Sequence, residues 1–375
     1  MKQQNPFLVE GYLSPEYFCD RVQETAVLDE HIQNQRNVAL IAKRRLGKSG
    51  MIHNYFYQPS VKKNFYTFYI DIYDTKNLQE FTYELGKGIL NTLKSKGRKA
   101  LENFLAILKS LKTGVSFDIN GTPEWNLSIG EIHTPDIMLD EIFAYLESAD
   151  KPCIVAIDEF QVIADYPEKT IEAALRKRIQ NSHNAQFIYS GSKRHMMTEM
   201  FATQSRPFYN SAVLMGLDAI DEAVYLTFAN RHLQANAQQI SQEAFHYLYE
   251  KFNGTTWYIQ YVLNTLYADK RADITFGIED VDNAVLTIVQ HNSFAYRSLL
   301  YLLSPKQKEV LRAIAQEGQV EGIMTQRFLH KHHLTSSVVQ GASKVLLDKD
   351  LVTNDEGRYY VYDHFMELWL KKSET

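Results

Sequence analysis

The chain of 375 residues is 45% hydrophobic and 23% charged, which is ordinary for a folded protein of two or three domains and excludes extensive disorder. Its formal net charge of -5 excludes a global basic field of the kind that drives nonspecific nucleic-acid binding, so any contact with DNA must be local. The two distant cysteines indicate neither a disulfide framework nor a zinc site, and the lack of a long apolar run or a signal-peptide core predicts a soluble, cytoplasmic protein with no membrane partner.

The stretch "NVALIAKRRLGKSGMI", from Asn37 to Ile52, predicts a strand, a phosphate-binding loop and a helix. Its first six residues form a short aliphatic run of the kind seen in a strand that is buried on both faces. Apolar residues then recur at helical spacing after Ser49. The loop ends in Gly-Lys-Ser, but Ala42 stands where the motif has its first glycine. A chance Gly-Lys-Ser at the start of an ordinary helix is the alternative interpretation.

The residue types in this loop suit a nucleotide phosphate. A helix N-terminus presents unpaired backbone N–H groups and partial positive charge to an anion. Gly47 allows positive φ or a close approach of the backbone, Lys48 would bridge the β- and γ-phosphates, and the Ser49 hydroxyl would be a ligand of Mg²⁺. The alanine is compatible with this role if its φ is negative. The predicted nucleotide-binding residues of the loop are Ala42, Arg45, Leu46, Gly47, Lys48, Ser49 and Gly50.

The next part of the chain alternates strands and helices, which predicts an α/β fold with a parallel sheet. Further strands are expected at 65–74, 153–157 and 185–192, and helices at 23–33, 51–57, 78–93, 136–147 and 168–179. Residues 113–130 differ, because alternating apolar residues flank an Asn120-Gly121 turn. We interpret this segment as an inserted β-hairpin that decorates the core.

The stretch "CIVAIDE" supplies the acidic element that a phosphate loop requires, a buried strand that ends in carboxylates. Asp158 is expected to contact Mg²⁺ directly or through a water, and Glu159 to orient and deprotonate the attacking water. In a parallel sheet both would share a crevice with the loop before Gly47. The alternative, a solvated strand end, is less consistent with the presence of Lys48.

Polar residues beyond this strand are candidates for contacts with the γ-phosphate. Ser190, Ser192 and Lys193 follow the strand at 185–192, although a polar turn with a helix cap is an equal alternative. Arg206 and Arg194 are candidates for stabilising transition-state charge, within one chain or across a subunit interface. For each arginine, an ordinary surface position is the favoured alternative.

The C-terminal half predicts two further domains. From about 228 to 303 the pattern is almost wholly helical. Ser304 and Pro305 then start a helix, a second helix surrounds 326–331, a third begins at Thr335 or Ser336, and two short strands lie within 351–363, which is the order of a winged helix. We therefore expect an ATPase domain at 1–225, a helical lid at 226–303 and a winged helix at 304–375.

Several motifs together resemble the prokaryotic archaeal-type ATPase family, a branch of P-loop ATPases close to the STAND and AAA groupings. The motifs are "FCDRVQET", "IAKRRLGKSGMI", "CIVAIDEFQVI", "FIYSGSKRHMM", "SRPFYNSAVL", "NGTTWYIQYVLN" and "YYVYDHFMELWL". The resemblance spans nearly the whole chain and implies the same three-part organisation. Some members have a small residue other than glycine at the position of Ala42.

The same resemblance extends to residues outside the loop motif. It implies that Phe18 and Arg21 lie near the adenine and that "NGTTWY" faces the nucleotide, although many members have proline where Thr256 stands. Paired arginines before Gly-Lys-Ser, here Arg44 and Arg45, are typical of the family. We expect at least one of them to face outward, toward the lid or a neighbouring subunit.

The first functional hypothesis is a Mg²⁺-dependent ATPase that switches conformation between its ATP and ADP states. Lys48, Asp158, Glu159 and Arg206 are its predicted catalytic residues. Ser49 and Asp158 are its predicted metal ligands, and Phe18, Arg21 and Ser190 are added to the nucleotide-binding set. Its partner would be another protein or a second copy of the chain.

The alternative is a DNA-binding regulator in which the nucleotide is only structural. A winged helix places its third helix in the major groove, and that helix offers mainly Ser336, Ser337, Gln340, Ser343 and Lys344. This is little positive charge for phosphate contacts. The histidines His330, His332 and His333 lack other metal ligands and are expected to be solvated. A small-molecule phosphotransferase is less supported, because no acceptor pocket can be identified.

Overall fold

The computed structural model describes residues 4–96, 98–108, 115–117, 123–125, 132–269, 271–355 and 357–372. The chain divides into two compact units. One contains Leu8–Tyr225 and Thr255–Trp257, and the other contains Met1–Phe7, Leu226–Gly254 and Tyr258–Thr375. We call them the sheet unit and the helical unit. The helical unit includes both the expected lid and the expected winged helix, and the boundary drawn between these two at residue 303 stays a prediction.

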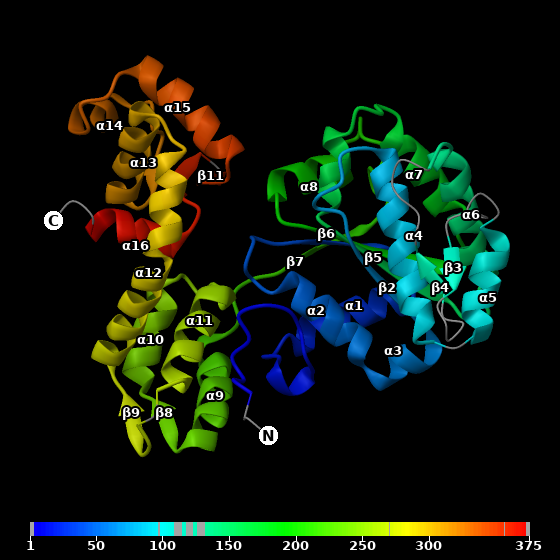
Figure 1. The fold of residues 1–375 in the computed structure, drawn as a ribbon, viewed down its shortest axis with the longest axis horizontal. Coiled ribbons are helices and arrows are strands. Elements are labelled where there is room, and N and C mark those ends of the chain that lie inside the picture. Colours follow the sequence, from blue (N-terminus) through cyan, green and yellow to red (C-terminus); the bar gives the residue numbers. More distant parts are fainter. Residues whose placement is uncertain are drawn as a thin grey trace. The chain divides into compact units, whose positions relative to one another are not determined.

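The sheet unit is built on a five-stranded parallel sheet in the order β2-β5-β6-β1-β7 (Figure 1). The strands are β1 Val38–Ile41, β2 Tyr66–Asp71, β5 Cys153–Asp158, β6 Ala185–Gly191 and β7 Val213–Gly216. The predicted parallel α/β sheet is confirmed. The edge strand β7 was not predicted, because its four residues are mostly exposed and show no buried run.

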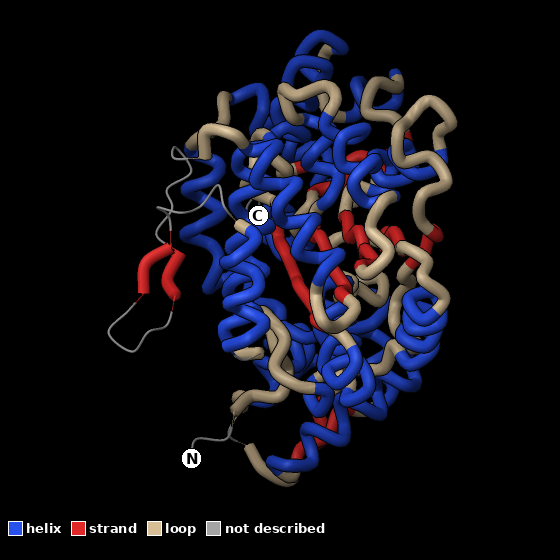
Figure 2. Tube along the Cα trace, turned by 90° about the vertical axis from the view of Figure 1, so that its right-hand side faces the viewer, coloured by secondary structure: helices blue, strands red, loops and turns tan. Residues whose placement is uncertain are grey.

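Helices cover both faces of this sheet. On one face lie α1 Val22–Gln33, α2 Lys48–Tyr57 and α3 Pro59–Asn64, and on the other lie α4 Leu78–Lys94, α5 Arg98–Ile107, α6 Pro135–Ser148, α7 Ile171–Gln180 and α8 Arg194–Ala202. In β5, Ile154 and Ala156 face the first layer while Val155 and Ile157 face the second. Burial on both faces explains why these strands read as continuous apolar runs. Figure 2 shows the strands of the sheet enclosed by helices.

A separate antiparallel pair occurs where the β-hairpin was predicted. It consists of β3 Val115–Phe117 and β4 Pro123–Trp125, with Val115 opposite Trp125 (Figure 2). The predicted Asn120-Gly121 turn and the outer ends of both predicted strands lie outside the described residues. Among the described residues there are also three short 3-10 helices, Pro15–Tyr17, Phe160–Asp165 and Gln234–Asn236.

The C-terminal half is mainly helical, as predicted. Its helices are α9 Glu222–Leu233, α10 Gln242–Lys251, α11 Thr256–Tyr267, α12 Ile278–Tyr301, α13 Pro305–Glu317, α14 Gln326–Lys331, α15 Ser336–Asp348 and α16 His364–Lys372. Two short parallel strands, β8 Gln238–Ile240 and β9 Ile274–Phe276, interrupt the helical pattern and were not predicted. At three residues each, they are too short to show a clear alternation of burial.

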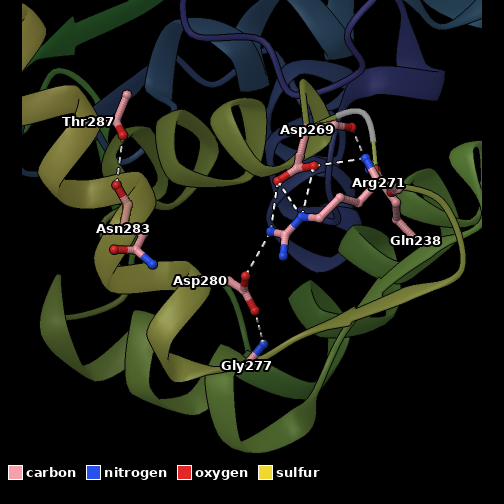
Figure 3. A network of polar contacts seen from close by, with 7 residues as sticks. All are labelled: Gln238, Asp269, Arg271, Gly277, Asp280, Asn283 and Thr287. Atoms are coloured by element: carbon pink, nitrogen blue, oxygen red, sulfur yellow. Dashed lines mark hydrogen bonds and ion pairs between the residues drawn. The ribbon is translucent and has the colours of Figure 1, made fainter.

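An arginine links the β8–β9 region to the start of α12 (Figure 3). The Arg271 guanidinium pairs with Asp269 and, at 2.8 Å, with Asp280. The other carboxylate oxygen of Asp280 accepts the Gly277 backbone N–H at 2.9 Å, which caps the helix. Gln238 donates to the backbone carbonyls of Asp269 and Arg271. These contacts fix the entry to the longest helix of the unit.

The winged helix has the predicted helix, helix, helix, hairpin order. Ser304 and Gln307 form a reciprocal capping box at the start of α13, which confirms the predicted start of the helix. Its sheet has the order β10-β12-β11, from Val320–Glu321, Arg358–Val361 and Val352–Asp355. Among the described residues, no helix is both long and apolar enough to span a bilayer.

Two side chains of this domain differ from the prediction. His332 was expected to be solvated, but its side chain is 8% exposed, and its Nε2 lies 2.7 Å from a Glu317 carboxylate oxygen. Ser343 was offered as a DNA-facing residue, but it is buried and donates to the Gln340 carbonyl. Neither side chain is free to face a partner.

A buried carboxylate in α16 makes the stability of the helical unit pH-dependent. Glu367 lies 2.6 Å from the Lys371 ammonium and 3.2 Å from His364 Nδ1. Burial raises the pKa of Glu367, but the hydrogen bonds from His364 and Lys371 outweigh it and hold the pKa below its usual value. A lowered pKa in the folded state adds stability above the unfolded pKa, and this stability is lost as pH falls through the folded value.

We therefore expect Glu367→Gln to reduce the free energy of unfolding by about 1–3 kcal/mol at pH 7, which is the typical cost of losing hydrogen bonds to a charged group. The deficit should shrink as the pH falls below about 4, the usual range of a glutamate pKa. Denaturant titrations across this pH range measure it. The exposed Glu309, on α13, gives the matched control Glu309→Gln. An equal deficit in both variants would contradict the assignment.

Candidate nucleotide-binding site

The loop between β1 and α2 has the backbone geometry that close approach to an anion requires. Gly47, directly before α2, has φ 92°, and Arg45 has φ 69°. Ala42 is buried and does not have positive φ, so a methyl group is accommodated where the motif usually has glycine. Alanine in place of the first glycine of the motif is therefore compatible with this loop conformation.

Lys48 is a buried ammonium without a carboxylate partner. The residue is only 6% exposed, and its Nζ donates to the Ala42 carbonyl at 3.3 Å. Within the described parts of the chain, no carboxylate lies at ion-pair distance from it. Burial lowers its pKa, while the more distant charges of Glu159 and Asp158 act in the opposite direction. A buried charge that these distant carboxylates compensate only in part, beside a glycine loop, fits a phosphate group.

Asp158 ends β5 opposite the start of α2. Its Oδ2 accepts the Ser49 hydroxyl at 2.8 Å and the Tyr69 hydroxyl, and its Oδ1 accepts the Glu159 backbone N–H at 3.0 Å. Burial raises its pKa, but the hydroxyls of Tyr69, Ser190 and Ser49 and the Lys48 charge lower the pKa overall. The Ser49 and Asp158 oxygens are hard ligands on facing elements, so the pair fits Mg²⁺.

Glu159 lies at the edge of the same site in a left-handed backbone conformation, with φ 55°. Its Oε2 accepts Gln161 Nε2 at 2.5 Å and the Ser192 hydroxyl at 2.7 Å. Ser192 in turn accepts from Arg44 Nε at 3.0 Å. The predicted water-activating carboxylate is therefore linked to the loop through Ser192 and Arg44.

The other predicted residues occupy varied positions. Ser190 is fully buried on β6. Among the described residues its hydroxyl has no partner with good hydrogen-bond geometry, although it contributes to lowering the pKa of Asp158. Arg206 pairs with Glu172 at 2.6 Å and with Glu199 at 3.2 Å, on α7 and α8. These ion pairs would have to break before Arg206 could meet a phosphate. Its role as a catalytic arginine stays a prediction.

Arg21 and Phe18 lie against the loop and the helix that follows it. Arg21 is 2% exposed, pairs with Glu24 at 2.7 Å and donates to the Leu46 carbonyl at 3.2 Å. A side-chain carbon at Gly50 would lie 3.3 Å from the Phe18 ring, so glycine lets this ring pack on α2. The structure thus gives Arg21 a bracing contact with the loop, and the predicted adenine contacts of both residues stay predictions.

The segment Thr255–Trp257 also holds the loop. The Trp257 backbone N–H donates to the Arg45 carbonyl at 3.1 Å, and the Thr256 hydroxyl donates to the Leu46 carbonyl at 3.4 Å. The Arg45 guanidinium carbon lies 4.2 Å from the centre of the Trp257 ring. Arg44 and Arg45 therefore point to different partners, Ser192 and Trp257.

The sequence alone did not identify two side chains of this site. Tyr69 is an aromatic residue within an aromatic strand, and nothing in "FYTFYIDIYD" distinguishes it from its neighbours. Gln161 follows Glu159 by two residues, and this proximity was the only available signal. Both contact a carboxylate of the site.

Fold and site together define a class, that of proteins with a P-loop ATPase fold followed by a winged helix. Residues 294–372 match a family model described as "Probable winged helix domain". The whole chain is similar to the Walker-type ATPase PABY2304 of Pyrococcus abyssi, at 15% identity and a TM-score of 0.64, over 98% of this chain and 99% of that one. The predicted P-loop ATPase fold with a C-terminal winged helix is confirmed.

Two further solved structures share this fold. The Aeropyrum pernix ORC2 protein in ADPNP-ADP complexes matches at 14% identity and a TM-score of 0.55, over 100% of this chain and 99% of that one. The Aeropyrum pernix ORC1 protein in complex with DNA matches at 14% identity and a TM-score of 0.52, over 96% and 94%. No curated protein matches the sequence. At these identities the similarity establishes the fold alone.

The Arg45–Trp257 contact can be tested by fluorescence. In a Trp125→Phe, Trp369→Phe background, Trp257 is the remaining tryptophan of the chain. We expect Arg45→Ala to shift its emission to longer wavelength, because the indole loses its cover, and to cost about 0.5–1 kcal/mol of stability. The matched control is Arg44→Ala, whose guanidinium lies near Tyr73 instead. An equal shift in both variants, or none in Arg45→Ala, would contradict the stacking.

Proposed function

We propose that this protein binds ATP with Mg²⁺, hydrolyses it to ADP and phosphate, and changes conformation between the two nucleotide states. The observation that carries the proposal is the buried ammonium of Lys48, which has no carboxylate at ion-pair distance among the described residues, beside the Ser49–Asp158 pair. The shared fold with a Walker-type ATPase, and with a protein solved with ADPNP and ADP, supports the same ligand.

Each residue has a definite task in this proposal. The loop N–H groups and Lys48 bind the phosphates, and Ser49 and Asp158 hold the metal ion. Mg²⁺, when bound, neutralises phosphate charge and acts as a Lewis acid. Glu159 accepts a proton from the attacking water. Gln161 and Ser192 both donate to its Oε2, and among the described residues no donor contacts Oε1, so Oε1 can accept from the water while both contacts are kept.

The proposed switch depends on where the chain passes from one unit to the other. Thr256 and Trp257 bond to the loop and belong to the sheet unit, whereas the rest of α11, from Tyr258 onward, belongs to the helical unit. The Tyr258 hydroxyl donates to the Tyr362 carbonyl at 3.3 Å and accepts the His364 N–H at 3.0 Å. Trp257, which contacts the loop, is therefore joined by one peptide bond to Tyr258, which contacts Tyr362 and His364.

Two substitutions separate binding from turnover. We expect Lys48→Ala to abolish measurable ATP binding in calorimetry, because it removes the buried phosphate-binding charge. We expect Glu159→Gln to keep ATP binding and to lower turnover about 10²–10⁴-fold, the usual contribution of a general base. The exposed Lys63, on α3, gives the control Lys63→Ala, which should match the wild type.

The outcomes that count against the proposal are distinct. If the wild type neither binds nor hydrolyses ATP with Mg²⁺, the proposed function is wrong. If ATP is hydrolysed but Glu159→Gln turns over at the wild-type rate, the assignment of Glu159 is wrong. Solution mass measured with ATP and with ADP tests whether the switch changes the assembly of the chain.

The alternative function is that of a DNA-binding regulator, and the exposed polar face of α15 favours it. This face carries Ser336, Ser337 and Gln340, and a neighbour of the same fold was solved in complex with DNA. Within α15, however, the charged residues are one base, Lys344, and one acid, Asp348. Few phosphate contacts are available to such a helix.

We therefore expect no retardation of duplex DNA in gel shifts at about 200 mM salt, and weak retardation at most at about 50 mM. Lys344→Glu tests whether any binding uses α15, and Lys63→Ala again serves as a control from the sheet unit. Tight binding at both salt concentrations that Lys344→Glu abolishes would support the regulator instead.

A further inference from the structure

Tyr69 reaches the candidate metal site from a strand that carries no predicted site residue. It lies on β2 with Ala156 of β5 as its register partner. Both side chains pack on the α2 side of the sheet. Asp158 is two residues beyond Ala156 and therefore points to the same face. This geometry lets the Tyr69 hydroxyl donate to Asp158 Oδ2, the oxygen that also accepts the Ser49 hydroxyl.

The Tyr69 ring is held in place by an aromatic column along α2. The His53 ring lies 4.2 Å from it, centre to centre, and follows Ser49 by one helical turn. Tyr12 stacks on His53 at 6.0 Å with an interplanar angle of 18°, and its hydroxyl donates to Asn54 at 3.0 Å. The position of the Tyr69 hydroxyl is thus fixed by packing and not only by its hydrogen bond.

The two donors to Asp158 Oδ2 differ in what they do when a metal ion is held. Ser49 is itself a ligand in the proposed site, so its hydroxyl must turn a lone pair toward the ion. Tyr69 comes from the sheet and has no such second task. Magnesium demands near-ideal octahedral geometry, so the orientation of its carboxylate ligand affects affinity directly.

We propose that Tyr69 is a positioning residue of the magnesium site, whose hydroxyl holds the Asp158 carboxylate in the orientation that accepts the ion. The inference rests on the proposed nucleotide function. The inference assigns to the Tyr69 hydroxyl the orientation of the metal ligand Asp158. It predicts that Tyr69 affects the affinity for the metal ion and does not affect nucleotide affinity in the absence of metal.

The test is Tyr69→Phe, which removes the hydroxyl and keeps the ring against His53. Binding of Mn²⁺ to the complex with ADP is measured from the electron paramagnetic resonance signal of the free ion, and ADP affinity in EDTA is measured by calorimetry. We expect Mn²⁺ to bind about 10-fold more weakly, the lower range for loss of a partner of a metal ligand, and ADP affinity in EDTA to stay within about 2-fold.

Two further variants keep the test decisive. Tyr66→Phe is the matched control, because Tyr66 lies on the same strand and donates to Asp150 instead. It should leave Mn²⁺ affinity unchanged. His53→Leu keeps the Tyr69 hydroxyl but removes its neighbour in the column, and should weaken Mn²⁺ binding less than Tyr69→Phe does. It also gives a reading if Tyr69→Phe does not fold: a loss of Mn²⁺ affinity in His53→Leu with unchanged ADP affinity in EDTA would support the inference, and an equal loss of both would overturn it.

The outcomes separate the inference from the function that it depends on. If the wild type shows no binding of Mn²⁺ that depends on ADP, the proposed function fails. If the wild type binds Mn²⁺ and Tyr69→Phe binds it equally well, the positioning role is overturned. It is also overturned if Tyr69→Phe weakens ADP binding in EDTA as much as it weakens Mn²⁺ binding, since that pattern indicates a general structural effect.

Discussion

The site depends on keeping charged groups out of water at the carboxyl ends of the parallel strands. Lys48 is 6% exposed and Asp158 is 5% exposed. Removing a charge from water costs several kcal/mol unless hydrogen bonds or an opposite charge compensate it. Asp158 is compensated by hydrogen bonds from three elements, whereas Lys48 has one carbonyl. Lys48 therefore has fewer compensating contacts than Asp158, and an anion bound beside it would supply further ones.

The loop between β1 and α2 is held in place through its own backbone carbonyls. The Leu46 carbonyl accepts from Arg21 and from Thr256, and the Arg45 carbonyl accepts the Trp257 N–H. Using carbonyls for the bracing keeps the N–H groups at the start of α2 available for a ligand. These carbonyls belong to the same short segment as the two residues with positive φ, Arg45 and Gly47.

Sequence patterns predicted the strands that have a clear apolar pattern. They failed for short or exposed strands and for side chains whose burial depends on tertiary contacts. The strands β1, β5 and β6 were found because burial on both faces leaves continuous apolar runs, whereas β2, whose burial alternates, was found from its aromatic and isoleucine content. The edge strand β7 and the three-residue strands β8 and β9 lack that signal. Similarly, His332 and Ser343 were misplaced because their burial comes from neighbours distant in sequence or from one turn of helix.

The site was predictable to the extent that its chemistry is local. Gly47, Lys48 and Ser49 are contiguous, and Asp158 ends an obvious strand, so their meeting follows from a parallel sheet alone. Tyr69 could not be found in this way. Its contact with Asp158 depends on β2 being the neighbour of β5 and on the register between the two strands. The sequence of one strand alone specifies neither the neighbour nor the register.

The position of Trp257 and Tyr258 bears on the proposed switch between nucleotide states, because the boundary between the two units falls between these residues. The two residues are adjacent, yet Trp257 contacts the loop while Tyr258 is buried among residues of the helical unit, stacked on Phe252 and bonded to Tyr362 and His364. Each contact lies within its own compact unit. The first turn of α11 is thus divided between the two units. In the proposed switch, this peptide bond would link a change at the loop to the helical unit without a long pathway of side chains.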